Sequence, residues 1–201
     1  NLNIDYLIIS HPDDLKKANK LILPGVGAFD ATMQQLIDSG LRDELNNLVI
    51  NNKVPILGIC VGLQVMGFGS DEGDLQGLGW IPGKVKKFDI NKIESKPKLP
   101  HMGWNTIKDI NNHNLFKGID NEFGFYFVHS FYFECKSEDN ILTTSNYGTD
   151  FASSISSCVL LLIKTGLPLH NTVIVFPGSI ALTSTSVLAK AFTDASGFIW
   201  S

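Results

Sequence analysis

The chain has 201 residues, which suits one domain of ordinary size with a sizeable buried core. Its net charge of −4, with no cluster of Lys and Arg, argues against a nucleic-acid-binding surface. Three cysteines cannot all pair, and none has metal-ligand spacing. We therefore expect a reducing, cytoplasmic setting without metal or cofactor. The most apolar run near the end, residues 158–163, is too short to span a bilayer, so no membrane association is expected.

Strands and helices alternate in the first part of the chain. Apolar runs and helical spacing predict strands at residues 3–9, 21–23 and 54–59, with helices at 12–20, after Asp30 and across 41–49. Asp30 is expected to cap its helix, and the stripes Met33, Leu36, Ile37 and Leu41, Leu45, Leu48, Val49 are interpreted as core. This order predicts an α/β fold with a doubly wound, mostly parallel sheet.

A glycine-rich turn, Gly25-Val26-Gly27, follows the second predicted strand. Its glycines allow a positive φ or a close approach of the backbone to a ligand. Ligands of parallel sheets bind at the carboxyl ends of the strands. The turn and Cys60, which ends the third strand, are therefore expected to meet at one site.

Cys60 lies at the junction of a predicted strand and a helix predicted at residues 62–68, with Gly58 and Gly62 two residues away on either side. This arrangement is typical of a nucleophile elbow, with sulfur in place of a serine oxygen. We expect the helix N-terminus to lower the pKa of the thiol and the Val61 N–H to face an oxyanion. Alternatively, Cys60 is a small residue that permits close packing.

The pattern changes after residue 70. A loop at 70–82 contains several glycines, and strands are predicted at 84–90 and on both sides of His129-Ser130 within 125–133. These segments predict an antiparallel segment added beside the parallel sheet. His101 and His129, each among aromatic residues, are either catalytic or hydrogen-bonded structural residues.

Together these segments resemble the class I, triad-type glutamine amidotransferases, most closely the glutaminase subunits of imidazole glycerol phosphate synthase. Five stretches carry the resemblance in the family's order, at residues 21–29, 58–64, 77–80, 100–105 and 127–130. The resemblance implies that Cys60 attacks the side-chain amide of glutamine. It also implies an oxyanion hole formed by Val26, Gly27 and Val61, and glutamine-binding residues Gly25, Gln64, His129, Ser130 and Phe131. The ammonia would pass to a (β/α)₈-barrel cyclase of histidine biosynthesis.

The resemblance covers about residues 3–153, and the family's first strand and its late His-Pro-Glu motif have no counterpart. The last histidine is His170, and no Glu follows Glu138. Charged residues number 33 in residues 1–150 and three in 151–201. We therefore divide the chain into an amidotransferase domain, 1–153, and a non-matching apolar tail, 154–201, interpreted as replaced or frame-shifted sequence. Without the motif, this chain is expected to be impaired or inactive in turnover.

Three alternative functions remain open. A related amidotransferase would supply ammonia to a surface-sugar synthase. A non-catalytic subunit would dock on a synthase barrel without hydrolysing glutamine. A different cysteine hydrolase would share only the elbow, although the stretch Pro100–Asn105 argues against it.

Overall fold

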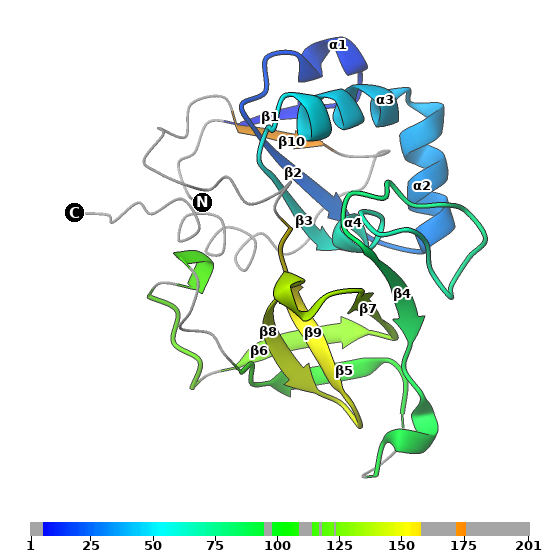
Figure 1. Ribbon diagram of the computed structural model, residues 1–201, viewed down its shortest axis with the longest axis vertical. Helices are drawn as coiled ribbons and strands as arrows, with labels where there is room; N and C mark the ends of the chain where they lie inside the picture. Colours follow the sequence, from blue (N-terminus) through cyan, green and yellow to red (C-terminus); the bar gives the residue numbers. More distant parts are fainter. Residues whose placement is uncertain are drawn as a thin grey trace.

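The computed structural model describes residues 6–94, 98–108, 114–116, 118–122 and 124–157, and the backbone of 172–175 (Figure 1). Four parallel strands form the first sheet, in the order β1 (Tyr6–Ile9), β10 (Thr172–Val175), β2 (Lys20–Gly25) and β3 (Ile56–Cys60). The helices of this part are α1 (Pro12–Leu15), α2 (Phe29–Asp38), α3 (Leu41–Asn46) with a π-helical turn at Asn47–Asn51, and α4 (Val61–Gln64).

Antiparallel strands make up two further sheets. One has the order β4 (Gly83–Lys87), β7 (Phe131–Cys135), β9 (Asp150–Ile155) and β8 (Ile141–Asn146). The other is the hairpin of β5 (His101–Asn105) and β6 (Phe125–His129). Short 3₁₀ turns lie at Ile90–Lys92, Asn114–Phe116 and Glu138–Asn140. In Figure 1 the parallel sheet and α1–α3 lie above the antiparallel strands, with β3 and α4 where the two parts meet.

The α/β fold with parallel and antiparallel parts is confirmed, whereas the doubly wound arrangement stays a prediction. The main buried cluster joins β2 to the helices through Leu21, Leu23, Leu15, Met33, Leu36, Leu41, Leu45, Leu48 and Val49. Both predicted core stripes are therefore buried, except that Ile37 is 39% exposed. Each such side chain contributes about 1.5–3 kcal/mol by leaving water.

Two predicted helices are shorter in the structure, and one cap is wrong. The helix at Pro12 ends at Leu15, because the chain turns there to begin β2 at Lys20. The helix after Cys60 ends at Gln64, since the Met66 and Gly67 N–H groups turn back to carbonyls only three residues earlier. Asp30 does not cap α2: the N-cap is Ala28, and no side chain of the helix's own start accepts its first N–H groups.

Strand β10 lies between β1 and β2 and is parallel to both. Its Ile174 pairs with Ile8 on one side and with Ile22 on the other. The crossover from β1 through α1 to β2 therefore leaves room for one strand, and a segment of the predicted tail occupies it. The division of the chain at residue 153 stays a prediction. His170 and the third cysteine, Cys158, lie outside the described residues.

Candidate active site

Cys60 is the last residue of β3 and directly precedes α4. Its backbone has φ 55° and ψ −122°, a conformation that a non-glycine residue seldom adopts. Strained backbone of this kind is typical of functional positions, because the surrounding structure must hold it in place. The elbow expected from the sequence is therefore present.

Three glycines allow the elbow to pack backbone against backbone. A Cβ on Gly62 would overlap the carbonyl oxygen of Leu23, at the end of β2. A Cβ on Gly58 would come within 2.7 Å of the Cα of Leu63 in α4. A Cβ on Gly25 would overlap the backbone nitrogen of Gly62. The ends of β2 and β3 and the start of α4 are thus held together without intervening side chains.

The turn predicted to complete an oxyanion hole begins beside the thiol. Gly25 pairs with Cys60 in the register of β2 and β3, so the two strand ends are neighbours as expected. Gly27 has φ 111°, which only glycine adopts readily, and Val26 is exposed. Val61 follows Cys60, and its N–H forms a hydrogen bond to the thiol sulfur.

The pKa of the Cys60 thiol lies above its ordinary value, so the predicted lowering is wrong. The main cause is that protein surroundings replace water around the sulfur, although the residue keeps an exposed surface. The hydrogen bond from Val61 acts in the opposite direction, and the charge of Glu72 raises the pKa further. Helix α4 has only four residues, too few for a large dipole.

Two histidines predicted from the sequence form a hydrogen-bonded pair. His129 Nδ1 lies 2.9 Å from the carbonyl oxygen of Phe131, which can only accept, so Nδ1 carries the proton. The other nitrogen, Nε2, therefore accepts from Nδ1 of His101 at 3.1 Å. Burial lowers the pKa of both rings, that of His101 to about 4. Both rings are neutral at pH 7, and neither nitrogen of His129 remains available to a substrate.

The segment after His129 nevertheless reaches the elbow through its backbone. The carbonyl oxygen of Phe131 lies 3.5 Å from Nε2 of Gln64, at the end of α4. The Ser130 carbonyl accepts a hydrogen bond from the Phe88 N–H at 3.1 Å. The structure thus brings Gln64 and Phe131 together, and their role in binding glutamine stays a prediction. The His129 ring packs in an aromatic cluster with Phe88, Phe127, Tyr132, Tyr147 and Phe151.

Glu72, whose charge acts on Cys60, was not predicted as a site residue from the sequence. Its carboxylate accepts the Phe29 N–H at 2.8 Å, at the start of α2. The sequence offers one weak indication of a role for Glu72, which is its position in a glycine-containing loop after the elbow. Among the described residues, no three His, Cys, Asp or Glu side chains lie close enough together to hold a metal ion.

The sequence family described as "Glutamine amidotransferase class-I" matches residues 2–155. The chain belongs to the class I glutamine amidotransferases, and the expected family is confirmed. Within that class, it is 47% identical over 157 residues to "Imidazole glycerol phosphate synthase subunit HisH" of Bdellovibrio bacteriovorus, covering 78% of this chain and 76% of that protein. The protein of the same name from Leptospira borgpetersenii is 42% identical over 155 residues, which cover 77% and 76%.

A third relative, from Methanococcus maripaludis, is named "Imidazole glycerol phosphate synthase subunit HisH 2". It is 44% identical over 155 residues, covering 77% of this chain and 75% of that protein. Within the part of the chain that the structure describes, no helix is both long enough and apolar enough to cross a membrane. The cytoplasmic location stays a prediction.

Proposed function

We propose that the chain is the glutaminase subunit of an imidazole glycerol phosphate synthase, with Cys60 as its nucleophile. The observation that carries this proposal is the elbow conformation of Cys60 beside the Gly25 turn, in a chain of this family. The thiolate attacks the side-chain amide carbon of glutamine and forms a C–S bond. The C–N bond then breaks, and the proton given up by the thiol moves to the leaving nitrogen, which departs as ammonia. Water hydrolyses the thioester to glutamate and the free thiol.

Each neighbouring group has a proposed role in this reaction. The N–H groups of Val61 and of the turn at Val26 and Gly27 would stabilise the oxyanion. Gly25, Gln64, Ser130 and Phe131 would line the glutamine site. At His129 the backbone, and not the ring, would face the substrate. The negative charge of Glu72, which reaches Cys60, would attract the α-ammonium group of glutamine.

The hydrogen bonds of His129 and His101 make neither ring suitable as the general base. Both nitrogens of His129 are occupied, and the Nδ1–H of His101 is bonded to His129. Loss of a general base costs about 10²–10⁴-fold in rate. Because the sequence also has no His-Pro-Glu motif, we propose that the chain reacts once at Cys60 and turns over glutamine poorly. The non-catalytic docking subunit therefore stays a second candidate function.

The partner is proposed to dock on the outer face of the β5–β6 hairpin. Four large apolar side chains, Met102, Trp104, Tyr126 and Val128, are exposed on this face, Trp104 by 70%. They form directly opposed cross-strand pairs, Met102 with Val128 and Trp104 with Tyr126. Contiguous exposed apolar surface marks interaction sites, and aromatic residues dominate their binding energy. We assign this face to the (β/α)₈-barrel cyclase.

The proposed function is tested by covalent labelling with 6-diazo-5-oxo-L-norleucine, a glutamine analogue with a reactive diazoketone. Cys60→Ala should fold and lose all labelling, measured by mass spectrometry of the intact chain. Labelling of the variant at the wild-type rate would assign the reactive thiol to Cys135 or Cys158 and refute the proposed site.

The proposed docking face is tested by binding to the cyclase subunit. Trp104→Glu should abolish this binding, whereas the exposed control Ile90→Glu should not.

A further inference from the structure

The start of α2 lies directly after the turn that begins beside Cys60. Its N-cap, Ala28, offers no side-chain acceptor. The first N–H of the helix, that of Phe29, is instead bound by the carboxylate of Glu72 at 2.8 Å. Since the first N–H groups of a helix have no partner inside the helix, a carboxylate at this place supplies both a hydrogen bond and a favourable charge. The loop after the elbow thus caps α2.

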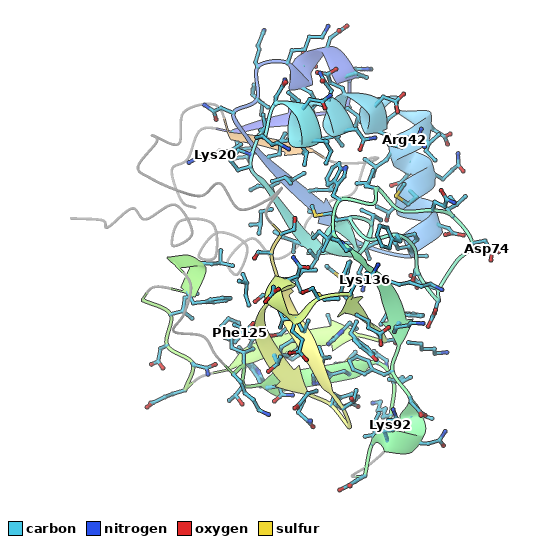
Figure 2. The ribbon with its side chains drawn as sticks, in the orientation of Figure 1. Lys20, Arg42, Asp74, Lys92, Phe125 and Lys136 are labelled. Atoms are coloured by element: carbon cyan, nitrogen blue, oxygen red, sulfur yellow. The ribbon has the colours of Figure 1, made fainter. Side chains whose placement is uncertain are left out.

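Asp30, one residue into α2, holds the same loop in return. Its Oδ2 accepts the Asp74 N–H at 2.9 Å, and its Oδ1 accepts the Leu75 N–H at 3.1 Å. A Cβ on Gly73 would overlap the Asp30 carboxylate, so the glycine leaves room for this contact. Figure 1 shows the loop after α4 beside α2, and Figure 2 places Asp74 at its outer edge.

The other side of the loop is anchored to β4. The Asp71 N–H donates to the Val85 carbonyl at 2.9 Å, and the Glu72 N–H donates to Ser70 Oγ at 3.0 Å. Glu72 therefore lies between two fixed points of the loop: Asp71, which is hydrogen-bonded to β4, and Asp74, which is hydrogen-bonded to Asp30. Backbone hydrogen bonds to an ionised carboxylate are among the stronger ones in proteins.

Both ends of the turn that is predicted to complete the oxyanion hole, Gly25 to Phe29, are held in place. Gly25 is fixed by its pairing with Cys60, and Phe29 by its buried ring and by Glu72. We propose that Asp30 is a positioning residue for the glutaminase site: its carboxylate holds the Glu72 loop against α2 and so fixes the turn from Gly25 to Phe29 beside Cys60. This inference rests on the proposed function of Cys60.

The test compares two reagents on the full chain of Asp30→Ala, Asp30→Asn and the control Asp38→Asn. Asp38 lies at the other end of α2, where its exposed carboxylate accepts a hydrogen bond from the side-chain amide of Gln34 at 2.7 Å. The diazoketone analogue of glutamine reports on the organised site, and its kinact and KI are measured separately. Iodoacetamide reports only on the thiol. Urea unfolding of each variant establishes that it is folded.

Asp30→Ala should lower kinact for the diazoketone by about 10- to 100-fold, because small displacements of a positioned group have effects of this size. Iodoacetamide labelling at high pH should stay close to the wild-type rate. Asp30→Asn keeps an oxygen acceptor and should recover part of the loss, and Asp38→Asn should match the wild type. Because Glu72 is no longer held beside the thiol, the iodoacetamide pH profile of Asp30→Ala should also shift toward that of Glu72→Gln.

A wild-type kinact in Asp30→Ala, or an equal loss with both reagents in the folded Asp30→Asn variant, would overturn the positioning role. If the wild-type chain itself fails to react with the diazoketone at Cys60, the proposed function fails. The Asp30 proposal is then decided by the iodoacetamide pH profile, since an unshifted profile in Asp30→Ala contradicts it.

Discussion

Gly62→Ala tests the elbow at its tightest contact. The new methyl group would overlap the Leu23 carbonyl oxygen and lie 2.7 Å from the Leu23 carbonyl carbon and 3.0 Å from that of Pro24. These are backbone atoms of β2, so no side chain can rotate away. Overpacking costs about 1–3 kcal/mol, whereas replacing glycine in a helix returns up to about 1 kcal/mol. We expect a net loss of about 1–2 kcal/mol in the free energy of unfolding.

The effect on the site should exceed the effect on stability. To relieve the overlap, α4 must move away from β2, which separates Cys60 from the Gly25 turn. Urea unfolding and diazoketone labelling of Cys60 measure the two effects. Gly69→Ala is the matched control, because its Cβ would meet only the Leu75 carbonyl oxygen, at an ordinary 3.7 Å. If Gly62→Ala unfolds and labels as the control does, the close packing of α4 on β2 is not required.

Three further predictions concern proton binding and the sheet. Between pH 6.5 and about 4 the unfolded chain protonates at His101 while the folded chain does not, so the urea midpoint should fall as the pH is lowered. His101→Phe should make this dependence of the midpoint on pH weaker, and an unchanged dependence would contradict the neutral pair. Because the pKa of Cys60 is raised, its iodoacetamide labelling should keep accelerating above about pH 8.5, and Glu72→Gln should shift the profile to lower pH; a plateau at pH 7 would disprove this. Removal of residues 172–201, but not of 176–201, should abolish cooperative thermal unfolding, because only the former takes β10 out of the sheet; identical melting curves would rule out the strand.

The elbow could be predicted from the sequence because its signal is local. Glycines two residues on either side of Cys60 are needed wherever a strand turns directly into a packed helix, and the structure shows the close contacts that require them. The meeting of Cys60 with Gly25 also followed, since neighbouring parallel strands end at the same edge.

Contacts between distant segments that depend on side chains and on strand register could not be predicted. Asp30 has the residue type and approximate place of an N-cap, and only the fold shows that its acceptors serve Asp74 and Leu75. The pairing of His101 with His129 depends on the register of β5 and β6, which neither strand encodes alone. The direction of the Cys60 pKa depends on surrounding protein that no motif describes.

The place of β10 sets an order on folding. Strands β1 and β2 come early in the chain, but each has one edge that stays unpaired until residues 172–175 arrive between them. A nascent or partly folded chain therefore presents two adjacent, aliphatic strand edges to its surroundings for as long as synthesis and loop closure take. Contacts of such large sequence separation form slowly, and open strand edges invite pairing with other chains. Yield of the folded protein should thus depend on chaperones and low concentration more than on the stability of the finished sheet.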